Sequence, residues 1–422
     1  DTTTGAVDID ATGNITITDD VGVTSSGNAV ININSSAGFI RNSATSNGVA
    51  DIITAGGTIT LEANTGIADS TGSAGLDIDS GTGAISLTHD GTSNGTFVDY
   101  ISTEGDSFGL TVVATTTSGV VTFDSLSTGT LTLTSVNTAA NNLTVTADGA
   151  VIATNVDTTT GSLTLATSAG TMVLTDVDST TGAMNIDATL AITVTDVDST
   201  AGAINIETSG AVDIAIAAGG IATTLSGGNV IVTADNAAGT ITLADGSDKI
   251  TAANADADVT LSAGATIAVT GGADDDVDID AGGTISLTAD TITGVGVEGL
   301  DTLVIDDTGA GAIAVAELTG NTIAVTTITV GNDSFGIIDI DYQNDNVVDI
   351  NDNHALNNID LDNGTTSSFT YTATAGNVTA TAITTADKAI TITASNGTIA
   401  LVNLDTTTGA VDIDATGNIT IT

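Results

Sequence analysis

The chain has 422 residues, of which 52 are Asp or Glu and only 3 are Lys or Arg, and its formal net charge is −49 at pH 7. This charge repels phosphate groups, which excludes nucleic acids and anionic lipid surfaces as partners, and the absence of cysteine excludes disulfides and thiolate metal sites. With 41% hydrophobic residues the chain can still bury a core, but it has no run of about 18 apolar residues that would span a bilayer.

The first eighteen residues, DTTTGAVDIDATGNITIT, recur without substitution at 405–422. Within them VDID and ITIT alternate apolar and polar residues, which is the pattern of strands with one buried face. Asp8 and Asp10 should therefore point outward together. The exact repeat predicts that the chain is a slice of a longer tandem-repeat protein with a 404-residue period; the alternative is head-to-tail assembly of identical chains.

Strings with the pattern Gly-x-Ile-x-Leu, rich in β-branched residues, follow along the chain, and no segment is a convincing helix. Two stretches interrupt the pattern, Phe97–Leu110 and Gly331–Gln343, which share the letters DSFG and hold many of the few aromatic residues. We interpret both as wider coils or seams between blocks, with a contact site as the alternative.

The middle of the chain repeats most regularly, because NVDTTTGSLTL at Asn155, DVDSTTGAMNI at Asp176 and DVDSTAGAINI at Asp196 follow one another at nearly equal spacings. A repeat of this length without helices predicts an all-β protein, a parallel β-solenoid with about 20 residues per coil and no α-helix of note. We expect residues 1–422 to form a single continuous solenoid shaft. A string of immunoglobulin-like domains is the all-β alternative, but its period would be about 100 residues.

Stacked coils should place equivalent residues above one another, which puts Val151, Met172, Ile192 and Val212 in one apolar ladder. The same stacking aligns the carboxylates of the turn motif, which recurs at Asn403. Carboxylates about 5 Å apart repel one another, and a hard cation with oxygen ligands would remove that cost. The alternative is that these residues are solvated and cap backbone amides. The candidate calcium ligands are Asp157, Asp176, Asp178, Asp196 and Asp198.

A second candidate calcium region lies between residues 339 and 362, where Asp and Asn are dense. From Asp349 onward, oxygen-bearing side chains occupy loop positions one, three, five, nine and twelve of an EF-hand, but His354 replaces the glycine at six and Asp360 the glutamate at twelve. The alternative is a turn-rich coil with Asn ladders. His89 and His354 are isolated, which argues against a His-based metal site or triad. The candidate ligands here are Asp339, Asp341, Asp349 and Asp360.

Paired carboxylates two residues apart, such as Asp278 and Asp280, recur along the whole chain and are expected to point outward like Asp8 and Asp10. Two such carboxylates could act as the acid and the nucleophile of a glycosidase. The pattern recurs along the chain and does not mark one distinctive place, however, so we expect no enzymatic activity. Outward Thr-x-Thr pairs, as in LTLT at Leu131, could form the flat arrays of ice-binding solenoids; the alternative is that Thr is simply a good β-former.

Four strings, GNITIT at Gly13, GTITLEA at Gly57, GNVIVTA at Gly228 and GTISLTA at Gly283, resemble the shafts of filamentous-haemagglutinin-like adhesins and related giant bacterial surface proteins. The resemblance implies a right-handed β-helix and an extracellular, cell-surface location. The chain departs from the family in lacking a recognisable secretion domain and in having far fewer Lys and Arg residues.

These observations together predict the structural shaft of an extracellular fibre or giant adhesin that acts in cell-surface attachment, cell–cell contact or matrix. The expected partner is the protein itself, by end-to-end continuation and lateral bundling, with surface glycans or other cells as further partners. Ca2+ is the only cofactor expected. The alternatives are an ice-binding or calcium-dependent adhesion module, and a carbohydrate-active β-helix enzyme.

Overall fold

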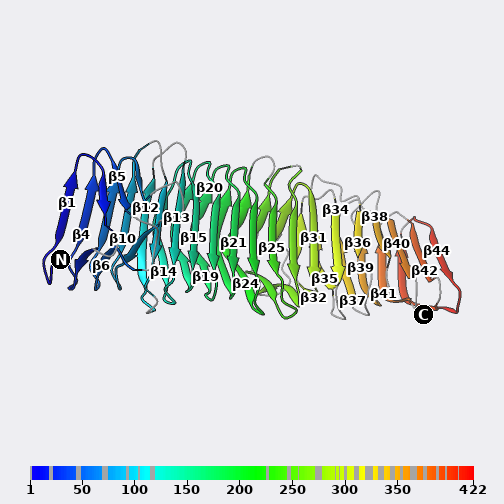
Figure 1. Cartoon of the computed structure of the whole chain (residues 1–422). Coiled ribbons are helices and arrows are strands. Elements are labelled where there is room, and N and C mark those ends of the chain that lie inside the picture. Colours follow the sequence, from blue (N-terminus) through cyan, green and yellow to red (C-terminus); the bar gives the residue numbers. More distant parts are fainter. Residues whose placement is uncertain are drawn as a thin grey trace. The chain divides into compact units, whose positions relative to one another are not determined.

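The computed structural model describes residues 2–18, 22–43, 49–68, 75–91, 95–102, 105–114, 119–224, 228–244, 249–254, 256–270, 278–289, 291–293, 295–298, 302–307, 313–318, 327–330, 337–342, 347–351, 355–361, 368–373, 378–385, 389–394, 397–406 and 408–422. Between residues 296 and 377 we describe only the backbone path of the strands and not their side chains. In all of these ranges the regular elements are β-strands, and every strand pairing is parallel (Figure 1). These ranges contain no helix that could cross a membrane. The predicted all-β parallel β-solenoid is confirmed.

The chain divides into two compact units, residues 1–205 and 206–422, which we call unit 1 and unit 2. The single continuous shaft over 1–422 and its 404-residue period stay predictions. Each unit contains two parallel sheets, and the chain passes repeatedly from one sheet to the other and back, one coil at a time.

In unit 1 the first sheet consists of β1 (Val7–Ala11), β4 (Ile31–Ser35), β7 (Ile59–Ala63), β10 (Ile85–His89), β12 (Phe108–Ala114), β14 (Leu131–Asn137), β16 (Val151–Ala153), β17 (Val156–Thr158), β19 (Met172–Leu174), β20 (Val177–Ser179) and β22 (Ile192–Ser199). The second sheet consists of β2 (Ile15–Ile17), β3 (Val23–Ser25), β5 (Phe39–Asn42), β6 (Ile52–Thr54), β8 (Gly66–Ile67), β9 (Leu76–Asp79), β11 (Thr96–Tyr100), β13 (Val120–Ser125), β15 (Asn142–Ala147), β18 (Leu163–Thr167) and β21 (Met184–Ala188). β23 (Ile204–Thr208) lies where the two units divide.

In unit 2 the first sheet consists of β24 (Asp213–Thr223), β26 (Thr240–Ala244), β27 (Ile250–Ala252), β29 (Thr266–Thr270), β30 (Ile279–Ala281), β32 (Thr291–Thr293), β33 (Gly296–Glu298), β35 (Ile313–Leu318), β37 (Ile337–Tyr342), β39 (Ala355–Leu361), β41 (Val378–Thr385), β43 (Ile399–Thr406) and β45 (Ile419–Ile421). The second sheet consists of β25 (Val230–Ala234), β28 (Val259–Ala263), β31 (Thr284–Ala289), β34 (Thr302–Asp307), β36 (Thr327–Val330), β38 (Val347–Asn351), β40 (Ser368–Ala373), β42 (Ile390–Ala394) and β44 (Val411–Ala415).

The coils differ in length, and the strand register measures the difference. In unit 1 Leu131 lies opposite Val151, whereas Ile31 lies opposite Ile59, which is a longer step along the chain. In unit 2 the step from β37 to β39 is short and the step from β25 to β28 is long. The predicted coil of about 20 residues therefore describes the regular middle repeats, and longer coils carry their extra residues in the connections between strands.

The core of each unit is filled by aliphatic side chains that stack in register. Val151 lies opposite Met172 and Met172 opposite Ile192, and all three are almost completely buried, which confirms this part of the predicted apolar ladder. Val212, the fourth predicted member, belongs to unit 2 and lies just before β24. Burial of each such side chain contributes roughly 1.5–3 kcal/mol, and β-branched residues suit the extended backbone.

The interruption at Phe97–Leu110 contributes two rings to an aromatic cluster in the core of unit 1. The rings of Tyr100 and Phe108 stack with 4.0 Å between their centroids, and Phe123 packs 6.1 Å from Phe108. All three are buried, and the Tyr100 hydroxyl donates a 2.8 Å hydrogen bond to the carbonyl oxygen of Gly81. These rings therefore pack in the core, and the interpretation of the segment as a wider coil or a seam stays a prediction. In the similar segment Gly331–Gln343, residues 331–336 and 343 lie outside the described residues.

Candidate functional site

The turn motif of the middle repeats folds in the same way in three successive coils of unit 1. Its second residue is a buried valine, and its fourth is a buried Thr or Ser whose hydroxyl bonds to backbone. The Ser179 hydroxyl donates to the Gly182 carbonyl at 2.9 Å, and the Ser199 hydroxyl accepts from the Gly202 amide at 2.7 Å. Hydrogen bonds between successive turns, such as the 3.0 Å bond from the Thr180 amide to the Thr158 carbonyl, stack the turns directly on one another.

The glycine that closes the motif is required by this close stacking. A Cβ atom added to Gly182 would lie 1.8 Å from the carbonyl oxygen of Gly161, and one added to Gly202 would lie 2.0 Å from that of Gly182. Real Cβ atoms do not approach so closely, so the backbone of one coil occupies the space that a side chain of the next would need. The glycine column thus fixes the spacing at which the acidic residues beside it are stacked.

The predicted aspartate ladder forms in the last coils of unit 1. Asp157 lies opposite Asp178, and Asp178 lies opposite Asp198, in consecutive coils of the first sheet. The next position below Asp157 is Asn137. The side chains point away from the core, because the flanking valines of each strand are buried.

A second column lies two residues earlier in the motif and consists of Asn155, Asp176 and Asp196. The Asn155 amide donates a 3.3 Å hydrogen bond to a carboxylate oxygen of Asp176, which places these side chains side by side across one coil step. The two columns together form a small acidic grid around Asp178, which we call the acidic grid. Its members are Asn155, Asp157, Asp176, Asp178, Asp196 and Asp198.

The charges of the grid act most strongly on its centre. Partial burial, together with the carboxylates of Asp176, Asp198, Asp196 and Asp157, raises the pKa of Asp178 from 3.8 to about 6. Burial and the neighbouring Asp176 likewise raise the pKa of Asp196. Both shifts mean that the folded protein resists full ionisation of the grid.

Carboxylate oxygens in such an array are the ligands that Ca2+ prefers, and a bound cation would offset their repulsion. In the described part of the chain, however, no three His, Cys, Asp or Glu side chains are placed so that they could hold one metal ion together. The arrangement therefore offers pairs of neighbouring carboxylates along the ladder, and calcium binding by these residues stays a prediction.

The second candidate region is placed by its strands alone. Asp339 and Asp341 lie on β37, and Asp341 is opposite Asp360 on β39, so these residues share the first sheet of unit 2. Asp349 lies on β38, in the second sheet, opposite Thr329 and Thr370. The four candidates therefore do not belong to one loop, and an EF-hand loop starting at Asp349 is incompatible with the strands β38 and β39.

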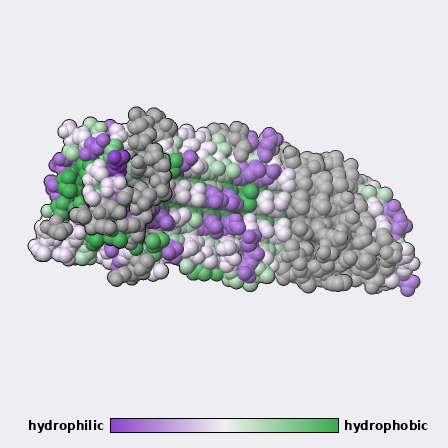
Figure 2. Space-filling model, in the orientation of Figure 1, coloured by the Kyte–Doolittle hydropathy of each residue, from purple (hydrophilic) through white to green (hydrophobic). Residues whose placement is uncertain are grey.

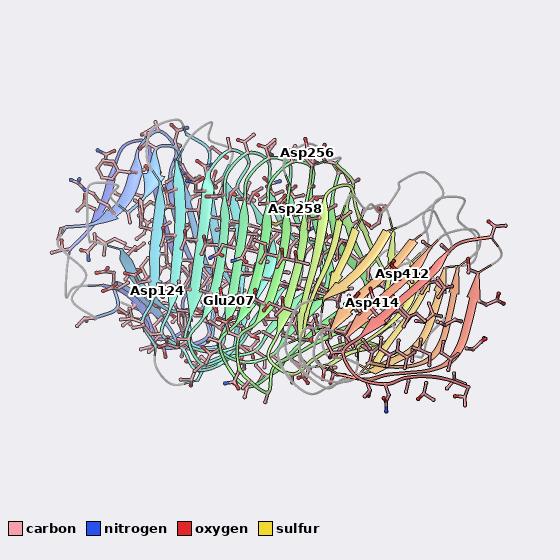
Figure 3. All side chains as sticks on the ribbon, turned by 90° about the vertical axis from the view of Figure 1, so that its right-hand side faces the viewer. Asp124, Glu207, Asp256, Asp258, Asp412 and Asp414 are labelled. Carbon is pink, nitrogen blue, oxygen red and sulfur yellow. The ribbon has the colours of Figure 1, made fainter. Side chains whose placement is uncertain are left out.

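A second aspartate ladder, which the sequence did not reveal, crosses the second sheet of unit 1. Asp77 lies opposite Asp99, and Asp99 opposite Asp124, whose carboxylate accepts a hydrogen bond from the Thr146 hydroxyl in the next coil. Burial and the two neighbouring carboxylates raise the pKa of Asp99 to about 6. Asp124 is labelled in Figure 3. The register steps of this ladder are unequal and longer than those of the middle repeats. A regular period in the sequence therefore does not predict this ladder.

The paired carboxylates do not all point into solvent. Asp8 and Asp10 are exposed, as predicted, but Asp278 is only 2% exposed and Asp77 is fully buried. The prediction for Asp278 was wrong because this residue precedes β30 and is not part of the alternating strand. Paired carboxylates therefore include structural residues as well as surface ones.

His89 is a core residue, because it points inward from β10 between Ala63 and Ala114 of the adjacent coils and is 2% exposed. Burial lowers its pKa, and its Nε2 atom has no hydrogen-bond partner among the described residues. These facts describe a neutral imidazole packed between two small side chains. His354 lies outside the described residues.

The outward threonines form short columns. Thr122, Thr144 and Thr164 are in register in unit 1, but the next position is Asn185, and in the parallel column Thr146 is followed by Ala166. On the face drawn in Figure 2, hydrophilic residues gather in patches among near-neutral ones over the described residues. A long flat threonine array, as ice binding would need, is therefore not formed by these columns.

One hollow of about 540 Å³ lies at the start of unit 1, lined by Thr2, Thr3, Thr24 and Ser26. The described residues of its lining carry hydroxyl groups.

Comparisons with known proteins found no match: no protein-family model, no curated protein and no solved structure matches the chain.

Proposed function

We propose that the chain is a structural shaft of an extracellular fibre or giant surface adhesin, without enzymatic activity. The observation that carries this proposal is that both units consist of coils stacked in parallel. Backbone hydrogen bonds run from each coil to the next. Every coil needs its neighbours to bury its aliphatic residues, so such a stack resists bending and local opening. Further coils can be added to such a stack in the same way, so its length has no built-in limit.

The acidic, lysine-poor composition fits this role. A net charge of −49 keeps neighbouring fibres apart unless cations bridge them, and it opposes binding to nucleic acid. Self-association by end-to-end continuation and lateral bundling, and contact with surface glycans or other cells, belong to the proposal through the resemblance to haemagglutinin-like shafts.

The first test is limited trypsin digestion of the native chain, combined with electron microscopy. Trypsin has only three possible sites: Lys249 is 4% exposed, the Arg41 guanidinium stacks 4.4 Å over the Phe39 ring, and Lys388 lies outside the described residues. We expect Arg41 and Lys249 to survive digestion while the urea-unfolded chain is cut at both. Straight rods in the images support the proposal, and globular particles, or hydrolysis of any glycan in a substrate panel, contradict it.

The acidic grid supports a second candidate function, calcium-dependent stiffening of the shaft. Its in-register carboxylates and the raised pKa of Asp178 show repulsion that a divalent cation would relieve. We expect millimolar Ca2+ to raise the melting temperature at pH 7.5 and Asp178→Asn to reduce that increase. The matched control is Asp187→Asn, an exposed aspartate opposite Ala166 on β18. An equal increase in melting temperature for wild type and both variants would contradict the calcium proposal.

A further inference from the structure

The buried imidazole of His89 interrupts a column of small side chains in the core of unit 1. Ala63, His89 and Ala114 lie opposite one another at the ends of β7, β10 and β12, in three successive coils of the first sheet. The strands β10 and β12 lie side by side in Figure 1, and all three side chains are almost completely buried. The coils on either side of His89 therefore fill this place with a methyl group, whereas the coil of β10 has an ionisable ring there.

The side chain that follows on the second sheet is polar as well. Thr96 begins β11 and lies opposite Ile67 on β8 and Val121 on β13, so the neighbouring coils are aliphatic at this place too. Thr96 is fully buried, yet neither its Oγ1 atom nor Nε2 of His89 has a hydrogen-bond partner among the described residues. Buried polar groups without partners lose their hydration without compensation, so the coil of β10 and β11 closes less favourably here than the coils before and after it.

Protonation of His89 is opposed by its surroundings. The strands packed most closely against β10 in the described structure are β7, β8 and β12. Glu62 is the single ionisable side chain on these three strands, and it lies on the outward face opposite Thr88. The charge of Asp90 favours the protonated imidazole, but burial outweighs it and lowers the pKa of His89. A proton taken up by His89 therefore favours any conformation in which the ring reaches water.

Acid strengthens the adjoining part of unit 1, which limits how far such a conformation can spread. Burial and the carboxylates of Asp77 and Asp124 raise the pKa of Asp99 on β11 to about 6, so this group becomes protonated as the pH falls to 5 and the repulsion along its ladder weakens. On the other side, the buried ring of Phe108 holds the start of β12 in the aromatic cluster. The end of β10 at His89 belongs to neither of these two supports.

We propose that His89 is an acid-sensitive opening point: between pH 7.5 and pH 5, its protonation releases the end of β10 from β7 and β12 while the rest of unit 1 stays folded. Little backbone pairing has to be given up, namely that of His89 with Ala63 and Ala114 and the 3.2 Å hydrogen bond from the Asp90 amide to the Ala63 carbonyl. The proposal goes beyond the shaft function and does not rest on it.

The size of the response follows from the linkage between protonation and opening. An exposed imidazole has a pKa of about 6.5, so a change from pH 7.5 to pH 5.0 raises the ratio of open to closed conformations by up to about thirtyfold. The full factor applies when the closed imidazole stays neutral at pH 5.0, and proton uptake by the closed state reduces it. The response is therefore measurable as a change in the population of the open conformation.

A single thiol can report the opening, because the chain has no native cysteine. Ala114→Cys places a thiol beside His89, and the control Ala188→Cys places one at a fully buried position of β21. The full chain is labelled with a dipyridyl disulfide at pH 7.5 and pH 5.0, and each rate is divided by that of the same variant unfolded in urea at the same pH. We expect the relative rate of Ala114→Cys to rise by about threefold to thirtyfold and that of Ala188→Cys to stay constant. A smaller rise at position 114 overturns the proposal.

Variants of His89 show whether this residue is the cause. His89→Leu and His89→Gln stay neutral at both pH values, so in either background the relative labelling rate of Ala114→Cys should no longer depend on pH. A rise that persists in both backgrounds overturns the assignment to His89. An equal rise at Ala188→Cys shows that unit 1 opens as a whole and overturns the local opening. Ala63→Cys repeats the measurement from the other side of the imidazole.

Hydrogen exchange of the unsubstituted chain gives an independent decision, free of any disturbance by an introduced thiol. Mass spectrometry follows peptides that cover β10 and β18 at pH 7.5 and pH 5.0, with each rate corrected for the intrinsic effect of pH on exchange. We expect β10 to lose protection at the lower pH and β18 to keep it. Equal loss in both strands, or no loss in β10, overturns the proposal.

Discussion

Asp178 sits at the centre of the acidic grid with four carboxylates around it, and its raised pKa makes stability depend on pH in a definite direction. Its folded-state pKa of about 6 exceeds the ordinary value of 3.8, so the folded state holds the proton more tightly than the unfolded state does. The contribution of this group to the free energy of unfolding is therefore largest below about pH 4 and falls as the pH rises to about 6.

Asp178→Asn should raise the melting temperature at pH 7.5 in EDTA and leave it nearly unchanged at pH 4. The amide removes a repelling charge at neutral pH, whereas at low pH the wild-type carboxyl is already protonated. Thermal melts of wild type and variant across this range give the difference directly. A difference that does not depend on pH, or an equal gain from Asp187→Asn, would refute the assignment of the repulsion to the grid.

His89 should act in the opposite direction. Its pKa is lowered by burial, so the unfolded state takes up the proton first, and the stabilisation is complete above pH 6.5 and lost as the pH falls below it. His89→Leu should stabilise the protein by about 1 kcal/mol at neutral pH, because it removes a buried nitrogen without a partner, and by more at pH 5. Urea unfolding at pH 8 and pH 5 measures both; an unchanged acid sensitivity would contradict the prediction.

At the scale of the coil, the glycine columns decide how closely turns can stack. Gly182→Ala should destabilise the protein by about 1–3 kcal/mol, because the new Cβ would lie 1.8 Å from the Gly161 carbonyl and the turn would have to shift. Gly13→Ala is the matched control, since a Cβ there meets no atom within 4 Å. Denaturant unfolding of the two variants should separate them clearly, and equal stabilities would show that the turn column is more compliant than its geometry indicates.

Regular coils could be predicted from the sequence and irregular ones could not. The ladder of Asp157, Asp178 and Asp198 followed from the nearly equal spacing of the three turn motifs, because constant coil length keeps equivalent residues in register. The ladder through Asp99 follows longer and unequal steps, and the length of a connection does not reveal which residues pair beyond it.

Burial of individual polar groups was also beyond the sequence pattern. The alternation of a strand correctly placed Asp8 and Asp10 outside, but it cannot distinguish an outward face that is solvated from one that is covered, as at Asp77. The aromatic segment shows the same limit, since the sequence reveals that Tyr100 and Phe108 are aromatic but not that their rings stack in the core.

At the scale of the whole molecule, the sequence predicted the architecture because the same solution is repeated many times. Three features favour stacked parallel strands: a period-two pattern, β-branched residues and closely spaced glycines. Each feature alone is ambiguous, but all three recur together in successive coils, and this agreement predicts the fold. The acidic composition, by contrast, excludes classes of partner by charge and does not specify which ligand binds the surface.

The direction of the interstrand hydrogen bonds has a mechanical consequence. In unit 1 these bonds run from coil to coil, along the stacking direction, so a force applied to the chain ends would load one coil at a time and not shear all of them together. Each released coil of about 20 residues would lengthen the chain by roughly 60 Å, at about 3.3 Å per residue. Single-molecule pulling should show a series of small, similar rips, and a single large one would contradict this expectation. A stack of this construction would therefore lengthen gradually under tension.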